Sequence, residues 1–443
     1  MTNSILSPKT FKSYSLGCRT NQAEIEAINM RLADCGLRQG KIGEVPNLIL
    51  LNTCVVTQKA EKETRKKIRR LKRLYPGSLL VVLGCGVTAR EKFKITLPEA
   101  DLFISNKDKD RVISLIEENY SSYLNKNPKI DLENKYVLSG RKFIKIQEGC
   151  ANFCTFCITS LLRGKPKSTP PDEIIKEINF WLSKGVKEII LTGINISLYG
   201  KDLKKKTDLR QLIKKILNET GVERITLSSI YPEVLTKEFV SLILGSPRTT
   251  KSFHLSIQSA SESVLERMGR NKNLNKLKKT LKEIKKKDPS FTFRADFIAG
   301  FPEETNEEFS KTLSFIKETS ISFAHVFTFS KRKGTKAYQN IKEEKWQEVS
   351  EDIKKQRAKG INEAVSKNKK KEAKNLINTI QETLIVRKTK GGFEGLTKNN
   401  WPIKIKTMNH EQGTMEIKGQ ILPVKITDFE SDQLLGEIFS LSK

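Results

Sequence analysis

Histidine is scarce in this chain, and the sequence lacks both long apolar runs and a secretory start. Only three of its 443 residues are histidines. No apolar stretch reaches the length needed to span a bilayer, which argues against a transmembrane protein. The first ten residues lack a charged start followed by an apolar core, so no secretory signal is expected. We therefore expect a globular, cytoplasmic protein with no membrane partner.

The chain contains far fewer acidic than basic residues, with 51 aspartates and glutamates against 81 lysines and arginines. The formal net charge is +30 and the isoelectric point is about 9.7. A field of this sign attracts polyanions and speeds their association. Nucleic acid is the expected partner, and an anionic membrane surface is the weaker alternative. The length predicts two to four domains.

Cysteine is also limited, but three of the seven cysteines fall within eight residues. They form the run Cys150-Ala-Asn-Phe-Cys154-Thr-Phe-Cys157. A tetrahedral zinc site needs a fourth nearby cysteine or histidine, and the nearest histidine, His254, lies far downstream. Thiolates also hold iron–sulfur clusters, and three ligands on a four-iron cluster leave one iron open for chemistry. In a cytoplasmic protein, such cysteines indicate metal or catalytic ligands rather than disulfides.

Strand–helix alternation in the first 120 residues predicts a parallel α/β sheet. The expected strands are 11–16, 48–51, 79–83 and 102–105. Cys18, Cys54 and Cys85 each follow the carboxyl end of one of the first three strands. Because such ends share one edge of a parallel sheet, the three thiols are expected to meet and form a second three-cysteine site. For any one of them, a buried structural thiol is the alternative. Cys35 falls within a predicted helix and is interpreted as a core residue.

A second α/β series follows a polar linker and predicts a partial barrel of about six βα units. The expected strands are 143–147, 188–192, 224–228, 253–258, 292–298 and 322–329. The site should lie at their carboxyl ends, as in other parallel barrels. The candidate ligand-binding residues at these ends are Thr192, Gly193, Ser228, Gln258, Ile298 and Gly300. For each residue alone, ordinary turn chemistry is an equal alternative.

Two basic segments are candidates for RNA contact. Residues 59–73 contain nine lysines and arginines, which predict either a solvated helix face or a phosphate-binding face. A charged connecting helix is expected over 343–376. From about residue 381 short strands are expected at 383–387, 403–407, 413–417 and 424–426. This predicts a small all-β barrel that binds RNA through charge and stacking on Phe393 and Trp401, or else caps the chain structurally.

The cysteine run resembles the cluster loop of the radical S-adenosylmethionine (SAM) superfamily, and the whole chain resembles the methylthiotransferase family. The blocks that carry the wider resemblance are Gly17–Asn21, Asn52–Ala60, Gly84-Cys85, Lys145–Cys150 and Gly391–Ile403. Leu191–Asn195 with Tyr199-Gly200, Arg224–Ile230 and His325–Ser330 are most similar to the branch that acts on threonylcarbamoyladenosine in tRNA. The sibling branches act on isopentenyladenosine in tRNA or on a ribosomal-protein aspartate.

The resemblance implies three domains and a linker. These are an auxiliary-cluster domain (8–120), a linker (121–138), a radical-SAM partial (β/α)6 barrel with its connecting helix (139–375) and a TRAM domain, a small all-β barrel that binds RNA (376–443). It further implies two 4Fe-4S clusters, with Cys150, Cys154 and Cys157 binding the SAM-cleaving cluster. Cys18, Cys54 and Cys85 would bind the auxiliary cluster, which carries the sulfur. The implied product is a methylthio group at C2 of the modified adenosine next to the anticodon.

Three positions depart from the family pattern. Ser256 and Ala260 stand where the family usually has proline and glycine, and Glu303 stands where it usually has glycine. These departures affect details of the SAM pocket and not the cysteines. We expect a monomer that takes electrons from an external donor and binds the tRNA anticodon stem-loop. A protein of another class, an RNA-binding protein that uses both cysteine trios structurally without catalysis, remains the competing hypothesis.

Overall fold

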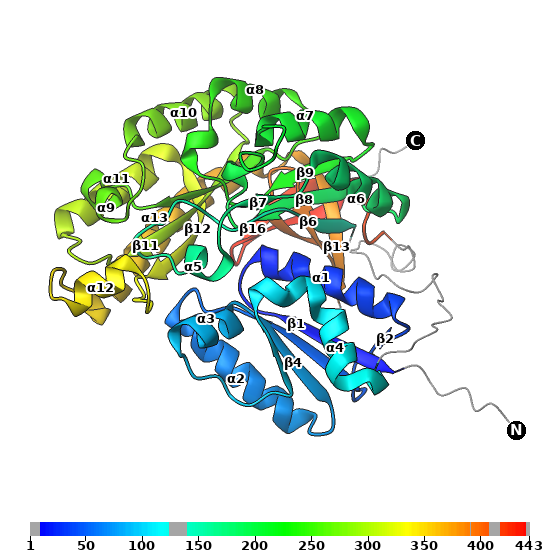
Figure 1. Ribbon diagram of the computed structural model, residues 1–443. Coiled ribbons are helices and arrows are strands. Elements are labelled where there is room, and N and C mark those ends of the chain that lie inside the picture. The colour runs from blue at the N-terminus through cyan, green and yellow to red at the C-terminus, as the bar shows by residue number, and fades with distance from the viewer. Residues whose placement is uncertain (1–8, 124–139, 390, 407–416, 440–443) are drawn as a thin grey trace, which may run out of the picture. The chain divides into compact units, whose positions relative to one another are not determined.

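The computed structural model describes residues 9–123, 140–389, 391–406 and 417–439 (Figure 1). The chain forms two compact units. The first comprises the described residues of Met1–Val137, Gly149–Lys165 and Ser330–Gln339, and the second comprises those of Leu138–Glu148, Pro166–Phe329 and Asn340–Lys443. Residues 124–138 of the predicted linker and 413–416 of a predicted strand lie outside the described residues. The domain boundaries drawn from the sequence stay predictions.

The first unit is built on a five-stranded parallel sheet in the order β2-β1-β3-β4-β5. Its strands are β1 (Thr10–Ser15), β2 (Arg38–Gln39), β3 (Leu48–Thr53), β4 (Leu79–Gly84) and β5 (Leu102–Ile104). β3 and β4 are buried along their whole length, as expected for apolar runs in the centre of a parallel sheet. The expected parallel α/β sheet is confirmed, with the short edge strand β2 as an addition.

Helices cover both faces of this sheet, and the strands alternate between the two resulting cores (Figure 1). The helices are α1 (Arg19–Asp34), α2 (Gln58–Leu74), α3 (Cys85–Phe93) and α4 (Val112–Tyr120). α1 and α4 pack on the face that carries Leu48 and Leu50. α2 and α3 pack on the face that carries Ile49 and Leu51. Cys35 directly follows the last residue of α1 as its C-cap, so it lies just outside the helix that was expected to include it. It is partly buried against the first core.

The second unit contains six parallel strands in two sheets. β6 (Arg141–Glu148), β8 (Glu188–Gly193) and β9 (Arg224–Leu227) form one sheet, and the two-residue β7 (Lys167–Ser168) adds an antiparallel edge. β10 (Ser252–Gln258), β11 (Thr292–Ala299) and β12 (Ile321–Thr328) form the other. Hydrogen bonds from Ile230 N to His254 O (2.8 Å) and from Ser256 N to Ile230 O (2.9 Å) continue the pairing between the two sheets. This arrangement confirms the predicted partial barrel.

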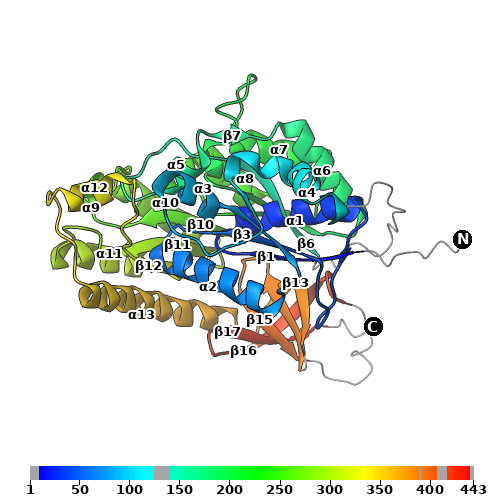
Figure 2. The same ribbon diagram turned by 60° about the horizontal axis from the view of Figure 1, so that its bottom comes forward.

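Helices follow the strands of this partial barrel. They are α5 (Thr159–Arg163, within the first unit), α6 (Pro171–Ser183), α7 (Leu209–Glu219), α8 (Lys237–Gly245), α9 (Glu262–Arg267), α10 (Leu274–Lys287), α11 (Asn306–Thr319), α12 (Lys336–Lys342) and α13 (Glu351–Leu376). α13 packs on β12 and α11, and Figure 2 shows it running toward the small barrel at its far end. It begins later than predicted because Ser350 caps it, which leaves Trp346 and Val349 before its first turn.

The last strands of the second unit form a closed barrel in the order β13-β14-β15-β17-β16. They are β13 (Ile380–Thr389), β14 (Gly392–Thr397), β15 (Pro402–Lys406), β16 (Ile421–Glu430) and β17 (Gln433–Ile438). The prediction that Phe393 and Trp401 stack on RNA is wrong, because both rings are buried in the barrel core. Trp401 Nε1 donates to Thr292 Oγ1 (2.9 Å), which ties the small barrel to β11. Among the described helices, none combines the length and apolar character that crossing a bilayer demands.

Candidate metal and ligand sites

Cys18, Cys54 and Cys85 lie at the carboxyl ends of three neighbouring strands. Thr53 and Gly84 are paired in register, and Cys54 and Cys85 follow them directly. Cys18 immediately precedes α1, three residues after the end of β1. Burial raises the pKa of the Cys54 thiol to about 12, and the nearby Cys85 and Cys18 add to this rise. The structure therefore brings the three thiols together, as the strand pattern predicted.

Glycine provides the space in which these thiols meet. Gly17 has a φ of +86°, and a Cβ atom there would lie 2.5 Å from Cys54 Sγ. Gly84 has a φ of +99°, and a Cβ atom there would lie 2.3 Å from Asn52 Oδ1. Both positions require a left-handed backbone and a close approach, which only glycine permits at low cost.

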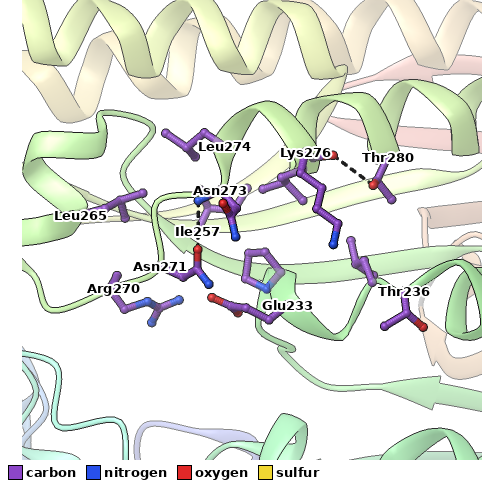
Figure 3. Close-up of a pocket in the computed structure, with 13 residues that line it drawn as sticks. Glu233, Thr236, Ile257, Leu265, Arg270, Asn271, Asn273, Leu274, Lys276 and Thr280 are labelled. Atoms are coloured by element: carbon purple, nitrogen blue, oxygen red, sulfur yellow. Dashed lines mark hydrogen bonds between the residues drawn. The ribbon is translucent and has the colours of Figure 1, made fainter.

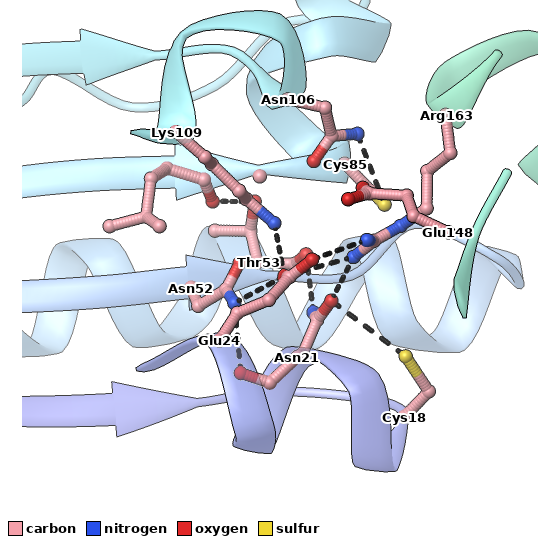
Figure 4. Close-up of polar contacts among 12 residues, drawn as sticks. Cys18, Asn21, Glu24, Asn52, Thr53, Cys85, Asn106, Lys109, Glu148 and Arg163 are labelled. Carbon is pink, nitrogen blue, oxygen red and sulfur yellow. Dashed lines mark hydrogen bonds and ion pairs between the residues drawn. The ribbon is translucent and has the colours of Figure 1, made fainter. Parts of the chain in front are cut away.

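A buried ion-pair network lies beside this trio (Figure 4). Arg163 donates from Nη1 to Glu24 Oε1 (2.6 Å) and from Nη2 to Asn21 Oδ1 (2.5 Å). Lys109 Nζ lies 2.5 Å from Glu24 Oε2. Both cations pair with Glu24, and Arg163 also interacts electrostatically with the Cys85 and Cys18 sulfurs, so it brings a positive charge close to them. Such a charge stabilises thiolates and an anionic cluster.

Two amides connect this network to the cysteines themselves. Cys18 Sγ lies 3.7 Å from Asn21 Oδ1, and Asn106 Nδ2 donates to Cys85 Sγ at 3.5 Å. Asn106 Nδ2 also donates to Leu162 O (3.1 Å) in the short helix α5. The site is therefore held by residues from several separate segments of the first unit.

The second trio lies in the loop after β6 and belongs to the same unit. Cys150 and Cys154 are buried, and Cys157 is half-buried. Cys150 N donates to Gly164 O (3.1 Å), and Cys157 N donates to Cys154 O (2.9 Å). Burial raises the pKa of Cys157, and the neighbouring Cys154 and Cys150 add to the effect. Phe153, between the cysteines, has a φ of +45° and is 63% exposed.

The α5 helix joins the two cysteine loops. It begins two residues after Cys157, and Ile158 and Leu162 pack with Val55, Cys85 and Ala89 in one small core. Lys92 Nζ donates to Leu161 O (2.8 Å). Cys85 of the first trio and the helix that follows the second trio therefore share one small core, which couples the positions of the two loops.

The donor type of the two trios suits iron–sulfur clusters. A zinc ion with bonds of about 2.3 Å holds two sulfurs roughly 3.8 Å apart. Among the described residues, the group whose ligand atoms lie within 4.8 Å of one another is His254, Asp296 and His325, and it contains no cysteine. On a four-iron cluster each thiolate binds its own iron, so the sulfurs stand further apart. Both trios therefore offer the donor type of an iron–sulfur cluster, and neither brings its three sulfurs as close together as a single zinc ion would.

The residues predicted to contact SAM lie at the carboxyl ends of strands in the second unit. Thr192 and Gly193 end β8, Ser228 directly follows β9, and Gln258 ends β10. Among the described residues the buried Ser228 hydroxyl finds no hydrogen-bond partner, so it could bind a polar group of a ligand. Gln258 has a φ of +73°, a strained conformation often found at binding sites.

The remaining two candidates, Ile298 and Gly300, lie at the end of β11. Ile298 is partly exposed. Gly300 has a φ of +69°, and a Cβ atom there would lie 2.4 Å from Lys354 Cγ. Packing against α13 alone therefore requires this glycine. Glu303, where the family usually has glycine, also has a positive φ of 63°. These SAM contacts stay predictions.

The cavity shown in Figure 3 is separate from these candidates. It has a volume of about 230 Å³ and lies among η4 (Pro232–Val234), β10 and α10. Ile257 lines it, and neither Ser256 nor Gln258 is among its lining residues. None of its described lining residues is a cysteine or a predicted SAM contact.

The basic segment predicted as an RNA contact forms α2. Six of its cations are exposed: Lys59, Lys62, Lys66, Arg69, Arg70 and Arg73. Three others are engaged, since Arg65 pairs with Glu61, Lys72 pairs with Asp101, and Lys67 lies over the Tyr14 ring. Within the described part of the chain no ion pair is found for the six exposed cations. They form a basic face available to phosphates.

Two polar clusters escaped the sequence reasoning. The first is the network of Glu24, Lys109 and Arg163, and the second joins His254, Asp296 and His325. Arg163 is 139 positions from Glu24, and no local pattern links them. One feature of the sequence points to the first cluster: Asn21 and Glu24 lie three residues apart on the helix that begins just after Cys18.

Comparison with known proteins gives two family matches. Residues 144–316 match the radical SAM superfamily, and residues 10–105 match the uncharacterized protein family UPF0004. The chain is 36% identical over 330 residues to the threonylcarbamoyladenosine tRNA methylthiotransferase MtaB of Chlamydia pneumoniae, covering 74% of this chain and 76% of that protein. It is 31% identical over 448 residues to the tRNA-2-methylthio-N(6)-dimethylallyladenosine synthase of Clostridium botulinum, covering 95% of each.

Among solved structures, the chain is similar to the radical SAM methyltransferase TsrM from Kitasatospora setae. The TM-score is 0.49 at 13% sequence identity, with 72% of this chain and 75% of that chain covered.

Proposed function

We propose, since the chain belongs to the radical SAM methylthiotransferase family, that it inserts a methylthio group at C2 of N6-threonylcarbamoyladenosine next to the anticodon of tRNA. The observation that carries this proposal is the presence of two cysteine trios in one compact unit, with Cys85 of the first trio packed against the helix that follows the second. A C–H bond on an aromatic ring needs radical chemistry, and the transferred sulfur needs a carrier. Two separate clusters meet these two needs.

The six cysteines take two roles in this proposal. Cys150, Cys154 and Cys157 would hold the 4Fe-4S cluster that acts on SAM, and Cys18, Cys54 and Cys85 would hold the auxiliary 4Fe-4S cluster. When bound, the first cluster supplies the electron that cleaves SAM, and the second supplies sulfur. Thr192, Gly193, Ser228, Gln258, Ile298 and Gly300 orient SAM and exclude water. An external donor provides the electrons.

The choice of substrate within the family rests on relatives and on charge. The relative from Chlamydia is named for threonylcarbamoyladenosine, and its identity of 36% exceeds the 31% of the relative named for dimethylallyladenosine. The second relative matches a larger share of the chain, so it supports an alternative in which the same chemistry acts on the dimethylallyl (isopentenyl) base. A net charge of +30 disfavours a basic ribosomal protein as the substrate.

The alternative from another class is a non-catalytic RNA-binding protein in which both cysteine trios bind structural zinc. In the structure neither trio brings its three sulfurs as close together as a single zinc ion would hold them. Anaerobic reconstitution with iron and sulfide separates the two. The proposed enzyme becomes brown and binds two four-iron clusters, whereas the zinc-binding alternative takes up one zinc ion at each trio.

Mass spectrometry of modified stem-loops tests the proposed reaction. The reconstituted protein is incubated with SAM, reductant and an equimolar mixture of stem-loops that carry threonylcarbamoyladenosine or isopentenyladenosine. We expect a methylthio group on the first and at least about a hundredfold less on the second, as sites built for polar groups discriminate strongly. Product on the isopentenyl stem-loop alone would assign the chain to the sibling branch, which acts on isopentenyladenosine.

The basic face of α2 is expected to hold the tRNA backbone. The triple variant Lys66→Glu/Arg69→Glu/Arg70→Glu should bind tRNA more weakly at low salt. It should also lower the slope of log affinity against log salt by about 0.7–0.9 for each lost phosphate contact. Filter binding across a salt series measures both effects.

A matched control changes the net charge equally on another helix. Lys279, Lys286 and Lys287 are exposed on α10 and can be replaced by glutamate together. This control should bind tRNA with a slope close to that of the wild type. Equal losses in the two variants would mean that overall charge acts on tRNA, and that α2 makes no specific contact.

A further inference from the structure

A cluster of polar side chains lies on one face of the sheet formed by β10, β11 and β12. It comprises His254 from β10, Asp296 from β11 and His325 from β12. His254 Nε2 lies 2.8 Å from Asp296 Oδ1, and His325 Nδ1 lies 3.2 Å from the same oxygen. The alternate residues of β11, such as Ala295 and Phe297, are buried on the opposite face. The cluster therefore occupies the face of the sheet opposite to the one that carries Ala295 and Phe297.

Two serine hydroxyls complete the surroundings of the carboxylate. Ser229 Oγ donates to Asp296 Oδ2 at 3.0 Å, and Ser256 Oγ lies 3.4 Å from the same oxygen. Burial would raise the pKa of Asp296, but hydrogen bonds from His254 and His325 hold it well below its usual range. An ionised carboxylate only accepts hydrogen bonds, so the ring nitrogens that face it carry protons. Asp296 thus fixes the orientation and the tautomer of both rings.

The two histidines differ in exposure. The His254 side chain is 11% exposed, whereas the His325 side chain is 62% exposed. Since His325 uses Nδ1 to bind Asp296, its Nε2 lies at the opposite edge of the ring. A neutral His325 offers an acceptor there, and a protonated one offers a charged donor. The cluster therefore presents one oriented imidazole to a ligand.

An exposed aromatic ring stands beside this imidazole. Phe327 lies two residues after His325 on the same face of β12 and is 45% exposed. The ring centroids of His325 and Phe327 are 6.5 Å apart. A phenyl ring at a partly open face can stack a nucleobase, whose flat surface it matches. At this separation, a purine on Phe327 would place a substituent of its six-membered ring close to His325.

We propose that this cluster binds the N6 substituent of the substrate adenosine, with Phe327 stacking the base and His325 hydrogen-bonding the carboxylate or hydroxyl of the threonylcarbamoyl group. The inference rests on the proposed function and adds the residues that decide between its two tRNA substrates. A carboxylate can pair with a protonated His325 in a charge-assisted hydrogen bond. An isopentenyl group would cover His325 without offering it a partner, and an unpaired polar group carries a desolvation cost.

A metal ion is the rival occupant of this cluster. Two imidazoles and one carboxylate, with ligand atoms within 4.8 Å of one another, resemble a two-histidine, one-carboxylate metal site. The observed hydrogen bonds favour the ion-free reading. Asp296 Oδ1 is already shared between two ring nitrogens, and Oδ2 is shared between two hydroxyls. The carboxylate is thus satisfied without an ion.

Binding of two stem-loops to the holoenzyme tests the proposal without catalysis. Fluorescence anisotropy is measured with anticodon stem-loops that carry threonylcarbamoyladenosine or unmodified adenosine at the target position. We expect His325→Leu to weaken binding of the modified stem-loop about tenfold, a loss near that of one hydrogen bond to a charged group. Binding of the unmodified stem-loop should stay unchanged. His325→Gln, which keeps a hydrogen-bonding group, should retain part of the preference.

Phe327→Leu provides the matched comparison on the same strand. It should weaken both stem-loops alike, because stacking does not depend on the substituent. Equal weakening of both stem-loops by His325→Leu would overturn the proposal. So would an additional equivalent of transition metal in the wild type that disappears in His325→Leu while the cluster absorbance is retained.

The outcome also separates this inference from the proposed function. A wild-type enzyme that forms the methylthio product while His325→Leu keeps the full binding preference would contradict only the role of the cluster. A wild-type enzyme that binds both stem-loops equally and yields no methylthio product would contradict the proposed function itself.

Discussion

Replacing Cys150 by serine should reduce SAM cleavage to background, on the order of 10⁶-fold below the wild type. Replacing Cys54 by serine should leave SAM cleavage intact and stop methylthio transfer. The reason is that each variant removes a ligand from a different trio, and each trio serves one step of the proposed reaction. Iron content should fall by about half in both variants, since each loses one of two clusters. Chromatography of the SAM products and mass spectrometry of the tRNA measure the two steps separately.

Cys35→Ser is the matched control for these variants. Cys35 lies at the end of α1, is partly buried, and packs against the core rather than against either trio. Its replacement should leave iron content and both activities unchanged. If Cys54→Ser abolished SAM cleavage as completely as Cys150→Ser, the division of roles between the trios would be wrong. The same would follow if both variants lost only tRNA binding.

The cysteine positions could be predicted because they follow from strand ends. β1, β3 and β4 are neighbours in the sheet, so residues just past their ends meet regardless of their distance in the sequence. Buried parallel strands appear as continuous apolar runs, which made β3 and β4 easy to locate. A site built on backbone topology is therefore accessible to reasoning from the sequence.

Short or glycine-containing strands were not predictable in the same way. β14 contains Gly392 and Gly395, and β17 contains Gly436, where the lack of side chains hides the alternating pattern. β2 and β7 have two residues each, too few for any period to show. These strands form through pairing with neighbours that a local pattern cannot reveal.

Side-chain roles depend on tertiary packing and were the least predictable feature. Trp401 was expected to face RNA, yet it is fully buried and donates to Thr292 of the partial barrel. No local sequence pattern gives His254 a partner, whereas in the structure it pairs with Asp296 on the next strand. In both cases the deciding contact lies more than forty residues away in the sequence, so composition and local periodicity contained no trace of it.

Arg163→Met should destabilise the chain by about 3–5 kcal/mol, the usual cost of breaking a buried ion pair from one side. The Arg163 side chain is 1% exposed and that of Glu24 is 5% exposed. Without the guanidinium, Glu24 Oε1 and Asn21 Oδ1 each lose a hydrogen-bond donor at a buried position. The shift of the urea midpoint, measured anaerobically on the cluster-loaded chain, reports this loss.

Arg111→Met is the surface counterpart of this change. Arg111 pairs with Glu118 at 3.2 Å, but the two side chains are 59% and 54% exposed. Its removal should cost less than about 1 kcal/mol, as exposed ion pairs contribute little. Comparable shifts in the two variants would show that the Arg163 network does not contribute more than an ordinary surface pair.

The loss of Arg163 should also change the auxiliary cluster site, and this effect separates an electrostatic role from a purely structural one. Arg163 interacts electrostatically with Cys85 and Cys18, so its charge favours the more negative, reduced state of a cluster bound there. We expect Arg163→Met to lower the midpoint potential of that cluster, while Arg163→Lys restores most of it. Lys109→Met, which removes the second cation of the same network, should lower the potential in the same direction. Redox titration followed by electron paramagnetic resonance measures each potential. Unchanged potentials in both methionine variants would restrict the network to a structural role.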